Sequence, residues 1–157
     1  MKKLLLSMML LLMVVVAADA QSRSIGGRLG HGIEFSYQHS VGASNMVNLQ
    51  VGLPFLNGFG LEGVVTYDWI FPITSWQEQG TWNWYAGVGG GVGMWGFDHP
   101  VGFAGVAGRI GVEYNFWFPM QLSLDWSPVI GPSFGKDHVG FNEYGLSSFG
   151  LGIRYLF

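Results

Sequence analysis

The chain has 157 residues, a net charge of −3, 26 glycines and no cysteine, and it carries 7 Trp, 6 Tyr and 12 Phe. This length leaves room for one domain, and the scarcity of basic residues disfavours nucleic-acid binding. The missing cysteine excludes a disulfide-stapled module, and the abundant aromatic residues disfavour disorder.

The first twenty residues have the pattern of a secretory signal peptide. Two lysines precede an apolar run from Leu4 to Ala18, and Ala18-Asp19-Ala20 fits a cleavage site of small residues. The run is too short for a comfortable helical membrane span. We therefore expect a signal peptide over 1–20 and a single domain over 21–157.

The rest of the chain alternates with a period of two between large apolar residues and small or polar ones. Such alternation is typical of strands whose two faces differ chemically. Clusters of Gly, Pro, Asn and Asp separate the alternating segments and mark turns. The predicted strands are 22–29, 33–39, 45–53, 59–69, 81–96, 101–116, 119–128 and 145–157.

The stretch 24–39 can be drawn as one long strand or as a hairpin. The apolar residues from Ile25 to Tyr37 stay in phase through Gly30-His31-Gly32, and a three-residue loop preserves this phase as well. A hairpin makes the number of strands even, as in closed bacterial outer-membrane barrels. We therefore expect a hairpin.

The two faces of the strands differ in size as well as polarity. One face carries aliphatic and aromatic side chains, and the other carries Gly, Ser, Asn, Gln and charged residues. The interior of an eight-stranded barrel is only just wide enough for side chains, so the small polar set suits the interior. The sequence thus predicts an all-β fold, a closed antiparallel eight-stranded transmembrane β-barrel in an up-and-down meander, with a polar, filled lumen. Glycines of the inner face are expected where close packing needs a small residue.

The end of the chain alternates up to a terminal aromatic residue. This resembles the C-terminal recognition strand of bacterial outer-membrane proteins, which the barrel-assembly machinery reads. The outward residues of this expected assembly signal are Phe149, Leu151, Ile153, Tyr155 and Phe157.

Together with segments 83–87, 122–128 and 152–157, the whole domain resembles the small eight-stranded bacterial outer-membrane β-barrel family, of which outer-membrane proteins A and X are the familiar types. The resemblance implies the outer membrane of a gram-negative bacterium, contact with lipopolysaccharide and phospholipid, help from periplasmic chaperones, and a monomer. It implies little about activity, because one fold hosts many functions.

The family places the C-terminus in the periplasm, and this fixes the expected topology. The outer turns are then 30–32, 54–58, 97–100 and 129–144. The inner turns are 40–44, 70–80 and 117–118.

Charged residues gather on the inward face of the strands. Unpaired charge in a narrow lumen is unfavourable, so we expect an ion-pair network that fills the barrel rather than a path for protons or ions. Arg109 and Glu113 are about 13 Å apart along their strand, so each is expected to pair across strands. The expected lumen charge network comprises Arg28, Glu34, Glu62, Asp68, Arg109, Glu113, Asp125 and Arg154.

Aromatic residues near strand ends are expected to contact lipid at the membrane interfaces. The expected aromatic girdle comprises Trp69, Trp82, Trp84, Tyr114, Trp117 and Trp126.

The histidines His31, His99 and His138 fall in expected outer turns and are interpreted as polar turn residues, since no ligand spacing supports a metal site. His39 ends a strand and is expected at the interface. We expect no catalytic residue, metal or cofactor.

The favoured function is structural or adhesive, and two alternatives remain. A narrow channel for water or small ions would use the lumen. The family also includes lipid-A-modifying enzymes, which need Ser, His and an acid near the outer rim. His138 and Glu143, with Ser133, Ser147 and Ser148 near, offer these residue types but no His-x-Ser pair.

Overall fold

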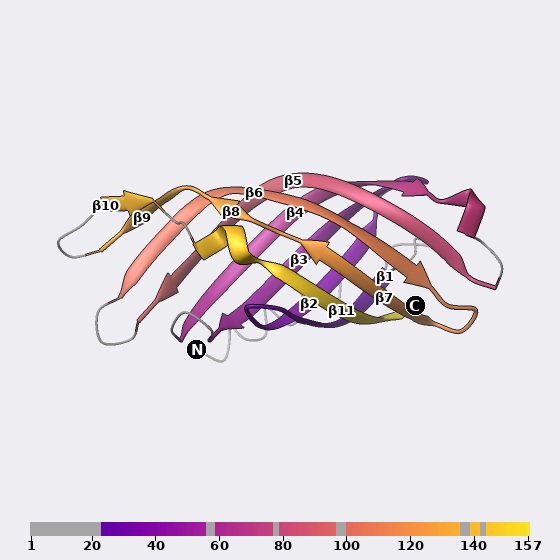
Figure 1. Ribbon diagram of the computed structural model, residues 1–157, viewed down its shortest axis with the longest axis horizontal. Coiled ribbons are helices and arrows are strands. Elements are labelled where there is room, and N and C mark those ends of the chain that lie inside the picture. The colour runs from indigo at the N-terminus through magenta and orange to yellow at the C-terminus, as the bar shows by residue number, and fades with distance from the viewer. Residues whose placement is uncertain (1–22, 56–58, 77–78, 97–99, 136–138, 142–143) are drawn as a thin grey trace, which may run out of the picture.

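The computed structural model describes residues 23–55, 59–76, 79–96, 100–135, 139–141 and 144–157. Eight strands form a closed antiparallel barrel, in which each strand pairs with its neighbours along the chain (Figure 1). The last strand closes the barrel by pairing with both the first strand and β7. The predicted fold class is confirmed. The barrel strands are β1 (Arg23–Leu29), β2 (Gly32–Ser40), β3 (Asn45–Pro54), β4 (Gly60–Pro72), β5 (Thr81–Trp95), β6 (Val101–Asn115), β7 (Met120–Trp126) and β11 (Phe149–Leu156).

The barrel has two different ends. At one, which we call the terminal end, Arg23 and Phe157 exchange backbone hydrogen bonds of 3.0 and 2.8 Å. The short helix η1 (Thr74–Trp76) lies at this end, between β4 and β5. At the other, the hairpin end, the β1–β2 turn lies near a group of short elements that follow β7 (Figure 1). No helix among the described residues is long and apolar enough to cross a membrane.

Residues 24–39 form a hairpin and not one strand. Arg28 lies opposite Glu34 in the β1–β2 ladder, and the amide of Gly30 donates to the carbonyl of Gly32 at 3.0 Å. The hairpin supplies the even number of strands that closes the barrel.

The expected loop 129–144 is largely structured, which corrects the prediction. After β7 the chain continues along β6 as β8 (Val129–Ile130) and β9 (Pro132–Phe134), and β10 (Val139–Phe141) folds back on β9. The reason is that β6 spans 15 residues and β7 only 7, so the rest of β6 would otherwise expose unpaired backbone groups.

A second correction concerns the start of the last strand. The helix η2 (Tyr144–Ser147) occupies the expected beginning of this strand, so β11 begins at Phe149 and not at residue 145. The expected inner turn 70–80 is also shorter, because β4 continues to Pro72.

The two faces of the barrel are arranged as predicted. Large apolar residues such as Val106 and Leu124 lie outside and are 62% and 56% exposed, whereas Thr66 and Ser123 are buried inside. Towards the hairpin end the interior also holds a small apolar cluster. That cluster consists of Val64, Phe103, Ala107 and Val129.

Two neighbouring glycines of β5 offer a matched test of the inward packing. A Cβ at the inward Gly89 would lie 2.7 Å from the Cα of Thr66 in β4, whereas a Cβ at the outward Gly90 would have its nearest neighbour, the carbonyl oxygen of Gly105, at 3.6 Å. Because backbone cannot move aside easily, Gly89→Ala is expected to lower the free energy of unfolding by about 1–3 kcal/mol or more. Gly90→Ala should unfold like the unmodified protein. Urea titration in detergent micelles measures both, and equal stability of the two variants would contradict the packing described.

Candidate functional site

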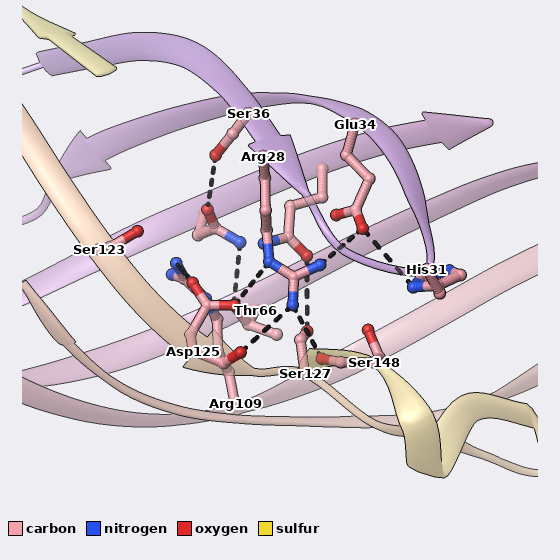
Figure 2. Close-up of polar contacts among 12 residues, drawn as sticks. Arg28, His31, Glu34, Ser36, Thr66, Arg109, Ser123, Asp125, Ser127 and Ser148 are labelled. Carbon is pink, nitrogen blue, oxygen red and sulfur yellow. Dashed lines mark hydrogen bonds and ion pairs between the residues drawn. The ribbon is translucent and has the colours of Figure 1, made fainter. Parts of the chain in front are cut away.

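A chain of ion pairs runs from the hairpin end into the middle of the barrel. It begins at Glu62 on β4 and passes through His31 in the β1–β2 turn. Figure 2 shows the part of the chain from His31 through Glu34 and Arg28 to Asp125. The chain of ion pairs continues across the lumen between residues from β1, β2, β4, β6 and β7. The members in order are Glu62, His31, Glu34, Arg28, Asp125, Arg109 and Asp68.

Asp125 on β7 lies at the centre of this chain. Its Oδ1 accepts a hydrogen bond from Nε of Arg28 at 2.6 Å, and its Oδ2 accepts one from Nη2 of Arg109 at 3.0 Å. The hydroxyl of Tyr85 on β5 also donates to Oδ2, at 2.9 Å. All four side chains are buried, so this one carboxylate holds two guanidinium groups in the interior.

Arg28 connects β2 with Ser148, the residue that precedes β11. Its Nη1 donates to Oε1 of Glu34 at 2.5 Å, and its Nη2 donates to the carbonyl of Ser148 at 2.8 Å. The guanidinium lies directly over Gly150 on β11, where a Cβ would approach the arginine Cζ closely. This glycine therefore makes room for the arginine, as inward glycines were expected to do.

Arg109 on β6 reaches across the barrel to β4. Its Nη1 donates to Oδ2 of Asp68 at 2.5 Å, and its guanidinium lies 4.5 Å from the centre of the Tyr85 ring. The pairing partners of Arg109 thus lie on other strands, and Glu113 is not one of them.

A second polar group lies nearer the terminal end. Arg154 on β11 donates to the hydroxyls of Ser36 and Ser123 at 2.8 and 2.6 Å, and to Oε1 of Gln121 at 3.2 Å. Glu113 accepts hydrogen bonds from Asn83 and Gln121, both at 3.0 Å. Of the eight expected network charges, Arg154 and Glu113 therefore belong to a separate hydrogen-bonded group and the other six to the ion-pair chain.

His31 has a role that sequence reasoning missed. Its Nε2 is 2.6 Å from Oε1 of Glu62, and its Nδ1 is 3.7 Å from Oε1 of Glu34. Burial lowers the pKa of His31, but the hydrogen bond to Glu62 and the charges of both glutamates outweigh it, so the pKa is raised. The position of His31 in a turn did not predict its contact with Glu62, because Glu62 is 31 residues away in the sequence.

His39, the other histidine that the structure describes, takes no part in this group. His39 lies near the terminal end, where its Nδ1 is 3.4 Å from the hydroxyl of Tyr37. His99 and His138 lie outside the described residues, as does Glu143.

The expected aromatic girdle is unevenly divided between the ends. Trp69, Trp82, Trp84, Tyr114 and Trp117 lie towards the terminal end, where the rings of Trp82 and Tyr114 are 4.8 Å apart. Trp126 lies towards the hairpin end and stacks on Phe149 at 5.8 Å.

The terminal end is hollow. A cavity of about 630 Å³ opens there, lined among others by Arg23, Gln38, Asn83, Glu113 and Gln121. The charged middle of the barrel separates this cavity from the hairpin end.

The residues of the expected assembly signal all point outwards. Phe149, Leu151, Ile153, Tyr155 and Phe157 are each about half exposed. They alternate with Gly150, Gly152 and Arg154, which face the interior.

Fold and site together define a closed β-barrel with an apolar exterior and a charged, densely hydrogen-bonded interior. The structure is similar to the N-terminal β-barrel domain of OprF from Pseudomonas aeruginosa, with a TM-score of 0.54 and 13% sequence identity. The similarity covers 87% of this chain and 96% of that domain, and it establishes the fold. No family model and no curated protein sequence matches the chain.

Proposed function

We propose that the protein is a small outer-membrane barrel of a gram-negative bacterium, related to the barrels of outer-membrane proteins A and X, with a structural role in the cell envelope or in surface contact. One observation carries this proposal: most large apolar residues of the barrel strands point outwards, while the charged residues of the ion-pair chain point inwards. A water-exposed apolar surface of this extent is unfavourable, whereas lipid covers it without penalty.

The composition of the lumen favours a structural role over transport. Three arginines and their partners cross the interior, and the side chains of Arg28, Arg109 and Arg154 are almost fully buried. Displacing them to admit an ion would break charge-assisted hydrogen bonds, which are among the stronger contacts in proteins.

The location is tested by expression of the full chain in a gram-negative host. The proposal predicts that the protein enters the outer-membrane fraction and migrates differently on an SDS gel before and after boiling, because a closed barrel resists the detergent until heated. A periplasmic protein with unchanged migration would overturn the proposal.

The role is tested by deleting the gene in the source bacterium. Loss of a structural barrel is expected to increase sensitivity to SDS and bile salts, and the intact gene should restore resistance. If expression of the protein changes the acyl chains of lipid A, and expression of the His138→Ala variant does not, the result would instead support a lipid-A-modifying enzyme.

The closed lumen gives a prediction for planar lipid bilayers. The protein is expected to add no resolved conductance steps in molar potassium chloride, because the ion-pair chain fills the middle of the barrel. Regular steps whose size changes with Arg109→Ala would contradict this expectation and support the channel.

A further inference from the structure

We propose that His31, Glu34 and Glu62 form a binding site for a divalent transition-metal cation, Zn²⁺ being the best suited, at the hairpin end of the barrel. One ligand atom from each side chain, an imidazole nitrogen and two carboxylate oxygens, lies within 4.8 Å of the other two. The proposal does not rest on the proposed function, since it concerns these three side chains alone.

The geometry of the strands brings the two carboxylates together. Glu34 on β2 and Glu62 on β4 lie in register with the same residue of the strand between them, Gly52 on β3. A Cβ at Gly52 would lie 2.6 Å from Cγ of Glu34 and 3.3 Å from Oε1 of Glu62. The missing side chain at this position therefore leaves space between two carboxylates, and the turn places the imidazole of His31 within reach of both.

The donors suit a transition metal. Zinc binds histidine nitrogen and carboxylate oxygen at about 2.0–2.2 Å, so its donors lie about 3–3.5 Å from one another in a tetrahedral site. The separation of 3.7 Å between Nδ1 of His31 and Oε1 of Glu34 needs only a small adjustment, while the other ring nitrogen, Nε2, lies 2.6 Å from Oε1 of Glu62. Imidazole favours Zn²⁺, Cu²⁺ or Ni²⁺ over Mg²⁺ and Ca²⁺, which prefer oxygen donors alone.

The nitrogen Nδ1 of His31 adds an independent observation. It is buried and has no hydrogen-bond partner among the described residues. Buried polar atoms normally have a partner, and a cation held between Nδ1 and the carboxylate of Glu34 would be one. Glu62 would then either bind the cation as well or orient the ring through Nε2, as carboxylates commonly do for metal-bound histidines.

Charge balance favours a divalent cation. The ion-pair chain contains four carboxylates, on Glu34, Glu62, Asp68 and Asp125, but only the two guanidinium groups of Arg28 and Arg109. Arg154 donates to neutral side chains instead. With His31 neutral the chain thus has two negative charges in excess, which one divalent cation neutralises. Arg28 already donates to Oε1 of Glu34, the oxygen near Nδ1 of His31, but a carboxylate has about four lone-pair sites, so Glu34 keeps acceptor sites for the metal.

The test is calorimetric titration of the full barrel, purified in detergent and washed with EDTA, with zinc chloride. We expect one site for Zn²⁺, no comparable binding of Mg²⁺, and an affinity reduced by more than about tenfold in His31→Ala and in Glu62→Gln. His39→Ala, which removes a histidine at the other end, is the matched control and should bind Zn²⁺ like the unmodified protein. The boiling-dependent gel shift verifies that each variant is folded.

A second readout follows from linkage. A cation that binds only the folded barrel raises the temperature at which the folded band disappears from the gel. We expect this rise with Zn²⁺ in the unmodified protein and in His39→Ala, and its loss in His31→Ala. Absence of Zn²⁺ binding in the unmodified protein would overturn the proposal. Unchanged binding in folded His31→Ala would overturn it too, because the zinc would then bind elsewhere on the chain.

Discussion

Asp125→Asn is expected to destabilise the barrel by about 3–5 kcal/mol, the usual effect of removing one partner from a buried ion pair. The substitution keeps the shape of the side chain and removes its charge, so two buried guanidinium groups lose the carboxylate that they share. Urea-induced unfolding in lipid vesicles, followed by tryptophan fluorescence, measures the change in the free energy of unfolding.

Ser127→Ala provides the control for this substitution. Ser127 follows β7 directly and is also buried, but among the described residues its hydroxyl makes one long hydrogen bond, of 3.4 Å to Gln50. Its loss is expected to lower stability by about 1 kcal/mol or less. If Asp125→Asn were no more destabilising than Ser127→Ala, the ion-pair chain would not be an important source of stability.

Val88→Arg is expected to destabilise the membrane-inserted barrel by about 2–4 kcal/mol, the effect of an arginine on the lipid face at the middle of a bilayer. Val88 is the central residue of β5, and its side chain is 49% exposed on the outer face. The same unfolding experiment in vesicles measures the effect.

Val41→Arg is the matched control, because Val41 is also exposed but lies in the turn between β2 and β3. Arginine near the membrane interface is expected to change stability by about 0–1 kcal/mol. Equal effects of the two substitutions would mean that Val88 does not face lipid.

The alternation in the sequence was sufficient to predict the eight barrel strands and the face on which their residues lie. In β4, for instance, Thr66 and Asp68 are buried and Val65 and Tyr67 are exposed, as their alternation indicates. This works because successive side chains of a strand point to opposite faces whatever the rest of the fold does.

The partners across the lumen could not be predicted in the same way. Arg109 on β6 pairs with Asp68 on β4, which is not its neighbour in the sheet. Alternation tells which residues point inwards, but the meeting of two side chains across the lumen depends on the register and tilt of every strand between them. Tyr85 was missed for the same reason: its inward position was evident, and its contact with Asp125 was not.

The short elements that follow β7 could not be predicted from the sequence for a different reason. Val129–Ile130 and Pro132–Phe134 are too short to produce a pattern, and they become strands only because β6 extends beyond β7 and offers free backbone groups. His31 and Glu62 likewise meet only when β2, β3 and β4 are in register, so the metal site proposed here could not be predicted from spacing.

The central claim is that the apolar face of the closed barrel contacts lipid, and spin labels test it most directly. The chain has no cysteine, so single cysteines at the exposed positions Val65, Val88 and Ile153 can each carry a nitroxide. Oxygen concentrates in lipid, so in vesicles it is expected to relax all three labels far more than a water-soluble nickel chelate does. A label at Val41 is expected to be relaxed more by the nickel chelate than by oxygen. Labels at Val65, Val88 and Ile153 that respond mainly to the nickel chelate would contradict the account, because these residues would then face water.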